Sequence, residues 1–504
     1  MKIIKLIYNE IIKQTKKKSF IISLALLLLF AGSLPLLYKS FAYEEATTNL
    51  YTTYDINIQQ EQIIKNPKTN QDELFNELTN QKIEIMKNAI SKKEQNSTFK
   101  INIYDEYTTT KLNTIVLEHI IKNEKIDYNN IDDNFFLTTT NYKNLTTEEL
   151  LQEQQQENKK LLELQQVIDT NNYLWYLKNT QKELDLTTET GKKTNELINE
   201  MITLNITDEN DTRIEEANKI IDYYNQKETP MSLSDYQKSD SKITYNQYLK
   251  ITNDKNKELD NKIAQSYYAL RNNIQYTNDA KSAFKSIINS DISLISLIIV
   301  VLGGAIVSSE FSKGTIRLLV IRPNKRYKLL LSKFLSLIVL TIIFGLIAYT
   351  TTFITTGLAF GFNNLLVNDL TSVGNQVIQQ SFLTNTISNT LIMLIPVMFI
   401  GTISFFLSTV TKSTALSVGL SIFILMGGTL AIALLSVIKF PFIDLTFLPY
   451  LDFSQFLNKL DLIKNYEMYQ IYYTFNKAIL VLLIWSIIIY LISNFIFCKK
   501  DIKN

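Results

Sequence analysis

The chain alternates between long uncharged runs and strongly charged stretches. The first run, 19–38, holds 20 residues without charge between Lys18 and Lys39. At about 1.5 Å per helical residue, this length just crosses a hydrocarbon core of roughly 30 Å. Later uncharged runs cover 292–309, 334–368, 370–411, 413–438 and 478–498. They predict an all-α polytopic membrane protein with six transmembrane helices, at about 19–38, 290–309, 330–352, 384–410, 414–438 and 478–498.

Residues 1–18 place apolar side chains at helical spacing, with lysines between them. Ile4, Ile7, Tyr8, Ile11 and Ile12 fall on one side. The pattern predicts an amphipathic helix in the membrane interface, and the basic n-region of a signal sequence is the alternative. Because the run at 19–38 is longer than the roughly 7–15 apolar residues of a signal peptide, we expect a retained span with its amino end in the cytosol.

Residues 39–289 contain one glycine, two prolines and abundant Glu, Lys, Gln and Leu, a composition that favours long helices. Thr146 and Glu149 have the spacing of a capping box. The alternation at 99–104 predicts a short strand. Apolar residues from Leu259 to Ile274 repeat every three or four positions and predict one long helix that enters the membrane near Ile287. We therefore expect a large, mainly helical extracytoplasmic domain between the first two spans.

Charge is distributed unevenly along the chain. Residues 40–290 hold 29 Lys and Arg against 40 Asp and Glu, a net charge of −11, so the remainder carries +13. An acidic middle between basic membrane segments argues for an exterior domain and against nucleic-acid binding. The basic stretches at 308–333, Lys412 and Lys499 alternate with a loop at 361–381 that has no Lys or Arg. By the positive-inside rule, both termini should be cytosolic.

Several classes of chemistry have little support in this composition. The chain has one cysteine, Cys498, and one histidine, His119, so it offers neither an intrachain disulfide nor a His/Cys metal cluster. No G-x-x-x-x-G-K-[ST] motif occurs. We expect no catalytic, cofactor-binding or metal site in this chain, and any ATP-Mg would be bound by another polypeptide.

The stretch at 308–333 carries seven basic residues and a single acid, Glu310. It lies between two predicted spans and is therefore expected to be a cytosolic loop. Glu310, Gly314 and Arg317 are spaced i, i+4 and i+7, which places them on one face of a predicted helix. The residue before Pro323 disfavours helical geometry, so that helix should end there.

This loop resembles the first cytosolic loop of the permease subunits of type-2 ABC exporters, the ABC-2 superfamily. The matching positions are Glu310, Gly314, Thr315, Arg317, Leu318, Leu319, Pro323, Arg326 and Lys333, and Asn324-Lys325 departs from the family's usual residues. The resemblance implies that 1–18 is an elbow helix, that 439–476 is re-entrant or interfacial, and that Glu310, Gly314, Thr315, Arg317, Pro323 and Arg326 couple the spans to an ATPase. It implies as partners a cytosolic ABC ATPase subunit and a second permease copy or a related permease in the bilayer.

Polar residues at the start of the fourth span suggest a translocation path. Asn385, Ser388 and Asn389 lie close together on a predicted helix, and polar groups in hydrocarbon need partners. Interhelical hydrogen bonding is the alternative to substrate contact. Pro396 should kink this span. No predicted span has a charge in its middle, which argues against an ion-coupled carrier.

The leading hypothesis is thus the permease subunit of an ATP-driven exporter of a peptide or hydrophobic compound in the cytoplasmic membrane of a bacterium. The first alternative is a non-transporting scaffold or receptor resembling the phage-infection-protein family, which would not need the pattern from Glu310 to Arg326. A mechanotransmitter acting on the cell envelope is the second alternative, and five spans after the exterior domain argue against it.

Overall fold

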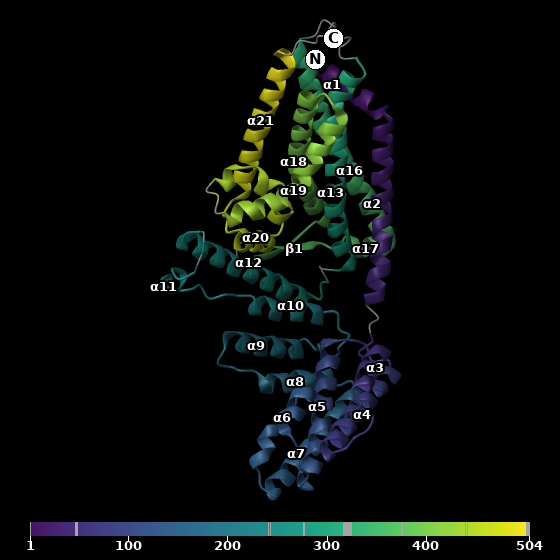
Figure 1. Ribbon diagram of the computed structural model, residues 1–504, viewed down its shortest axis with the longest axis vertical. Helices are drawn as coiled ribbons and strands as arrows, with labels where there is room; N and C mark the ends of the chain where they lie inside the picture. The colour runs from purple at the N-terminus through teal and green to yellow at the C-terminus, as the bar shows by residue number, and fades with distance from the viewer. Residues whose placement is uncertain are drawn as a thin grey trace. The chain divides into compact units, whose positions relative to one another are not determined.

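The computed structural model describes residues 2–45, 49–239, 241, 243–275, 278–315, 325–373, 376–438, 440 and 442–499 (Figure 1). Within these ranges, five helices are long and apolar enough to cross a membrane, and a sixth, at Thr414–Val437, qualifies as a helix bent by 52° near Gly428. The protein is therefore an all-α polytopic membrane protein. The chain forms two compact units, a membrane unit (Met1–Ser40 with Asp222–Asn504) and an insert unit (Phe41–Ile221).

The membrane unit contains all the predicted spans, and each predicted range is helical. Its elements are α1 (Lys2–Thr15), α2 (Lys18–Glu45), α11 (Leu233–Tyr236), α12 (Tyr245–Asn272), α13 (Asp279–Ile306), α14 (Ser308–Ser312), α16 (Arg326–Phe360), α17 (Phe362–Leu365), β1 (Asp369–Val373), β2 (Gln376–Gln380), α18 (Phe382–Thr411), α19 (Thr414–Val437), η2 (Ile443–Leu445), η3 (Leu448–Tyr450), η4 (Ser454–Phe456), α20 (Lys459–Tyr469) and α21 (Phe475–Lys499). Helix α10 (Ile214–Asn225) crosses the boundary between the units.

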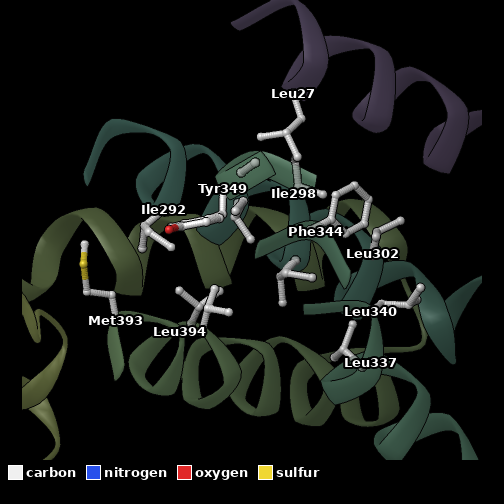
Figure 2. Packing of buried hydrophobic residues seen from close by; sticks show 14 of the residues in the cluster. Leu27, Ile292, Ile298, Leu302, Leu337, Leu340, Phe344, Tyr349, Met393 and Leu394 are labelled. Atoms are coloured by element: carbon white, nitrogen blue, oxygen red, sulfur yellow. The ribbon is translucent and has the colours of Figure 1, made fainter. Parts of the chain in front are cut away.

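The core of the membrane unit lies where α13 packs against α16 and α18 (Figure 2). Leu302, Leu337 and Leu394 are among its buried side chains, and Leu27 adds the contribution of α2. Close approach of α13 and α18 depends on small residues. A Cβ at Gly401 would lie 2.8 Å from Ile299 Cγ2, so alanine would not fit without a shift. Glycine at such a contact lets two membrane helices pack backbone to backbone.

A two-stranded antiparallel hairpin connects α16 to α18. β1 pairs with β2 in a register that sets Asp369 opposite Gln380. The hairpin packs against α12, whose Gln265 Nε2 donates to Ser372 Oγ at 3.1 Å. The sequence predicted a loop at 361–381 and no strands there. After α19, the predicted re-entrant stretch consists of three short 3-10 helices and α20, which agrees with the expectation of short helices.

The insert unit is built from helices around one main core. Its elements are α3 (Thr53–Glu61), α4 (Asn70–Ser91), α5 (Thr98–Ile121), α6 (Tyr128–Phe135), η1 (Thr139–Asn144), α7 (Thr147–Thr170), α8 (Tyr173–Glu183) and α9 (Glu189–Thr203). Leu78, Val116 and Ile131 lie at the centre of this core. The predicted capping box is confirmed, since Thr146 and Glu149 cap α7 reciprocally.

Two predictions about helices and strands within residues 39–289 are wrong. Residues 99–104 form the first turns of α5, not a strand, because Ser97 caps the helix and Phe99 and Ile103, four residues apart, are both buried. The long helix predicted from Leu259 to Ile287 is divided into α12 and α13. Asn273 ends α12 with φ +50°, a left-handed conformation that asparagine tolerates well.

Candidate functional site

A buried network of opposite charges lies at the end of the bundle that carries α14 and the start of α16, which we call the loop end. Lys333 Nζ lies 2.9 Å from Glu10 Oε2 and 2.7 Å from Glu310 Oε1. Lys13 also donates to Glu310 Oε1. The side chains of Lys333 and Glu310 are only 3% and 4% exposed. This loop-end network (Glu10, Lys13, Glu310, Lys333) joins α1, α14 and α16, three segments far apart in the sequence.

The amphipathic character of α1 explains how Glu10 reaches this position. Ile4 is 71% exposed and Tyr8 64% exposed, whereas Glu10 and Gln14 are buried. Helix α1 packs against α16. Ile4 and Tyr8 are thus available to lipid, whereas Glu10 and Gln14 face protein. The predicted helix over 1–18 is present as Lys2–Thr15, with a second helix starting at Lys18.

Burial and neighbouring lysines disfavour the charged form of Lys17, which lies beside the network. Burial lowers the pKa of Lys17, and the nearby Lys333 and Lys13 lower it further, to about 8. Among the described residues, neither Glu310 Oε2 nor Gln14 Nε2 has a hydrogen-bond partner, although both are buried. Leaving a buried polar atom without a hydrogen bond costs about 1–3 kcal/mol of folding free energy. A rearrangement that gave these two atoms partners would therefore be favourable.

Helix α14 is anchored to the transmembrane helices next to it. Ser408 Oγ of α18 accepts from the backbone N–H groups of Val307 at 3.2 Å and Ser308 at 2.9 Å. The same hydroxyl donates to the carbonyl of Gly304, which Ser417 Oγ of α19 also contacts at 2.8 Å. A displacement of α14 would therefore be transmitted directly to α13, α18 and α19.

Of the other predicted coupling residues, the structure places Thr315 beside Glu310 and Arg326 at the start of α16. Thr315 Oγ1 donates to the carbonyl of Glu310 at 3.4 Å. Arg326 begins α16 and donates from Nη1 to the carbonyl of Cys498 at 3.3 Å. Arg317 and Pro323 fall at 316–324, outside the described residues.

The helix predicted across Glu310, Gly314 and Arg317 is wrong in its length. Helix α14 ends at Ser312, and Gly314 has φ +68°, a left-handed conformation that favours glycine and stops a helix. Among the described residues, no atom lies within 4 Å of a Cβ built at Gly314, so close packing does not require glycine there. Glycine is explained at this position by its backbone angle.

A second ionic cluster lies at the opposite end, beside the β1–β2 hairpin, which we call the hairpin end. Lys281 Nζ of α13 lies 2.9 Å from Asp369 Oδ1, and Lys285 Nζ lies 3.7 Å from the same oxygen. Asn385 Nδ2 of α18 donates to Asp369 Oδ2 at 2.8 Å. Burial alone would raise the pKa of Asp369, but Lys285, Lys281 and Asn385 outweigh burial and lower it. This hairpin-end cluster (Lys281, Lys285, Asp369, Asn385) joins α13, β1 and α18.

The residues predicted to line a translocation path have local partners. Besides its bond to Asp369, Asn385 accepts at Oδ1 from Asn389 Nδ2 at 3.4 Å. Ser388 is exposed and donates to the carbonyl of Thr384 in its own helix at 2.8 Å. Asn385 of α18 is thus bonded to strand β1 and to its own helix, and neither of these two bonds joins two helices.

A third buried contact helps to locate the apolar core between the two ends. Asp291 Oδ2 of α13 accepts from Thr352 Oγ1 of α16 at 2.5 Å. Asp291 precedes Glu310 by 19 residues, and Lys333 precedes Thr352 by the same number. At helical rise, this separation is about 28 Å, close to the thickness of a hydrocarbon core. The two contacts therefore bracket the apolar core of these antiparallel helices.

A cavity of about 540 Å³ lies in the half of the bundle nearer the hairpin end, between α13, α18, α19 and the short helices that follow α19. Ile292, Met393 and Val397 line its apolar side, and Asp452, Asn465 and Tyr469 contribute polar atoms. We call it the Asp452 cavity. Its volume is in the range of small-molecule sites. Elsewhere among the described residues, no group of three or more His, Cys, Asp or Glu is placed to hold a metal ion.

The residues singled out from the sequence included Glu310 and Lys333 but not Glu10 and Lys13, which complete the loop-end network. Glu10 is the single acid of the basic segment 1–18, as Glu310 is the single acid of the basic loop. Two such lone acids beside many lysines were the available signal. The Asp452 cavity was not predicted either, because its walls come from four separate segments.

Comparison with known proteins places the membrane helices in a family. A family model described as "Protein of unknown function (DUF2705)" matches residues 247–503, half of the chain. The chain belongs to the DUF2705 family. The DUF2705 match begins in α12 and continues past the end of α21, so it includes Glu310, Lys333, the hairpin-end cluster and the Asp452 cavity.

A relative from Bacillus subtilis (strain 168), "Uncharacterized protein YhcI", is 30% identical over 213 residues. The alignment covers 42% of this chain and 66% of the relative, slightly less than two thirds of its length. Neither description names an activity.

Proposed function

We propose that this protein is the permease subunit of an ABC-2-type exporter, driven by ATP hydrolysis in a separate subunit. The observation that carries the proposal is the burial of Glu310, the acid of the family-like loop, in an ionic network with α1 and Lys333. In ABC-2 permeases the elbow helix and this loop adjoin the ATPase. The loop end then faces the cytosol, and the insert unit lies outside the cell.

The contacts at the loop end suggest how the coupling works. An ATPase that pushes on α14 shifts Val307 and Ser308, whose backbone N–H groups are held by Ser408. Because Ser408 and Ser417 share the carbonyl of Gly304, the movement reaches α18 and α19 together with α13. A loop that changes position needs alternative partners for its charges, and Glu310 Oε2, which has no hydrogen-bond partner among the described residues, is available for one.

Energy from another polypeptide also agrees with the sequence, since this chain has no phosphate-binding loop motif. The partners are then a cytosolic ABC ATPase and a second permease, in the cytoplasmic membrane of a bacterium. The buried charges of α13 and α16 bracket the hydrocarbon core, which favours an externally driven exporter over an ion-coupled carrier.

A mild-detergent purification of the tagged full-length protein from its native membrane, followed by mass spectrometry, tests the proposal. We expect a stoichiometric P-loop ATPase to co-purify with the wild type. It should be lost from a Glu310→Ala, Arg317→Ala double variant but retained by Lys325→Ala, a change to an exposed lysine of the same loop.

Absence of any ATPase from a monodisperse wild-type preparation would overturn the permease function. It would favour a non-transporting scaffold or receptor. The specific observation behind that second candidate is the insert unit, which has a helical core of its own.

A further inference from the structure

The Asp452 cavity has a wall that is fixed before any ligand arrives. Gln455 Nε2 donates to the carbonyl of Pro449 at 3.1 Å and to that of Asp452 at 2.7 Å. Its Oε1 accepts from Tyr473 Oη at 2.7 Å and from Asn465 Nδ2 at 2.8 Å. One buried side chain therefore ties together the short helices on this side of the cavity. A pre-formed wall reduces the entropy lost on binding.

The opposite walls are transmembrane helices with little polarity of their own. Ser293 and Ser296 of α13 line the cavity, but each donates to the carbonyl four residues earlier in its helix. Their methylene groups, with Met393 and Val397 of α18, leave a mainly apolar surface. Pro396 also lines the cavity, and its missing N–H leaves the carbonyl of Ile392 without a helical donor.

The described residues that line the Asp452 cavity include a negative charge and no positive charge. Asp452 is the charged residue among those that line the cavity, and it is exposed. Tyr469, Tyr473 and Phe453 provide aromatic surface on the same wall. A carboxylate attracts a cation electrostatically, and aromatic faces attract cations as well. An anion would meet repulsion from Asp452 and gain no compensating positive charge from these lining residues.

From this arrangement we propose that the Asp452 cavity binds amphipathic, aromatic or aliphatic cations, with the apolar part against α13 and α18 and the positive group near Asp452. The assignment of such a cation as the transported substrate rests on the permease function proposed above. Binding itself does not, because the cavity is formed by one copy of this chain without an ATPase.

A pair of ions with the same shape and opposite charge gives a direct test. The full-length protein in nanodiscs is equilibrated with radiolabelled tetraphenylphosphonium or tetraphenylborate, and binding to empty nanodiscs is subtracted. We expect saturable binding of the phosphonium at least tenfold tighter than that of the borate. Asp452→Asn should weaken phosphonium binding about tenfold, and it should strengthen borate binding because the repulsion is removed. The control Asp461→Asn, an exposed acid of α20 outside the lining, should have no effect.

A second pair of variants tests the place of binding independently of charge. Ser293→Trp should fill the cavity and abolish phosphonium binding, whereas Ser290→Trp, at an exposed serine of α13 outside the lining, should not. Size-exclusion profiles establish that each variant is folded. Equal binding of both ions, no saturable binding to the wild type, or unchanged binding in folded Ser293→Trp would overturn the proposal.

The binding assay and the ATPase purification fail separately. If the proposed permease function is wrong, no ATPase should co-purify while phosphonium still binds. Loss of the cation site would appear as absent binding while the ATPase still co-purifies.

Discussion

The two ends of the membrane unit differ in how completely the carboxylates beside a buried lysine are hydrogen-bonded. Each end holds a buried lysine in contact with carboxylates: Lys333 with Glu10 and Glu310 at the loop end, and Lys281 with Asp369 at the hairpin end. At the hairpin end, both oxygens of Asp369 have partners, on α13 and on α18. At the loop end, Glu310 Oε2 and Gln14 Nε2 have none among the described residues.

This difference suggests that the contacts at the hairpin end are fixed and that those at the loop end can rearrange. A buried ion pair with complete hydrogen bonding resists displacement, because every alternative position leaves charges uncompensated. The loop-end network retains unused hydrogen-bonding capacity and includes α1, whose other side is exposed. We therefore expect the hairpin end to hold the spans together and the loop end to transmit motion. The following changes test that contrast, from the largest expected effect to the smallest.

Lys333→Met should have the largest effect. It leaves two buried carboxylates, Glu10 and Glu310, and among the described residues only the more exposed Lys13 still forms an ion pair with one of them. Removing one partner of a buried ion pair costs about 3–5 kcal/mol. We expect a lower thermal midpoint in detergent, measured by tryptophan fluorescence, and poor recovery of monodisperse protein. Lys325→Met, at an exposed position, is the control. If both variants melt together with the wild type, the network contributes no stability.

Lys281→Met should destabilise the protein by less, about 2–3 kcal/mol, because Asn385 and Lys285 remain beside Asp369. The matched control is Lys285→Met. The Lys285 side chain is 52% exposed, so its removal should cost no more than about 1 kcal/mol. Chemical denaturation of the two variants in the same detergent compares them. A larger loss in Lys285→Met would contradict the assignment of Lys281 as the main partner.

The pH dependence of stability should report on the loop end. The pKa of Lys17 is lowered to about 8 from 10.5, so between these values the unfolded chain binds a proton that the folded chain does not. The free energy of unfolding should therefore rise as the pH increases from about 8 to 10.5. Thermal midpoints of the wild type and Lys17→Met measure this contribution by difference. Parallel curves for the two proteins would refute it.

The smallest expected effect comes from His119 of the insert unit. Here stability should fall as the pH rises, the opposite of the trend expected for Lys17. Burial alone would lower the pKa of His119, but its hydrogen bonds to Glu124 and Glu77, at 2.7 and 3.0 Å, outweigh burial and raise it. The stabilisation is complete below the ordinary pKa of 6.5 and is lost as the pH rises through the raised value. Amide hydrogen exchange near the end of α5 should then accelerate beyond its intrinsic pH dependence. The corresponding fall in the free energy of local opening should be less than about 1 kcal/mol. His119→Gln should remove the excess.

Much of the membrane unit was predictable because a bilayer demands about 20 apolar residues per helical crossing. That requirement located, from uncharged runs alone, the six apolar helices that are long enough to span a membrane, the bent α19 included. Local chemistry was equally informative at Thr146, where a hydroxyl and a carboxylate three residues apart cap α7. In these cases the structure is determined by residues close together in the sequence.

Other features depend on backbone choices or distant contacts that a pattern does not reveal. The alternation at 99–104 fits a strand, yet Phe99 and Ile103 also share a helical face, and packing in α5 decides between them. The left-handed conformations of Asn273 and Gly314 end helices that periodicity would continue. Glu10 and Lys333 are 323 positions apart, so their contact became visible only in the folded chain.

The contrast between the two ends is tested most directly by ATP turnover in the complex with the co-purifying ATPase. Equal amounts of folded wild type, Glu310→Gln and Asp369→Asn are reconstituted with that ATPase in nanodiscs, and ATP hydrolysis is measured with and without tetraphenylphosphonium. We predict that Asp369→Asn retains the response of the wild type and that Glu310→Gln loses it. An unchanged response in Glu310→Gln, or an equal loss in both variants, would contradict the assignment of coupling to the loop end.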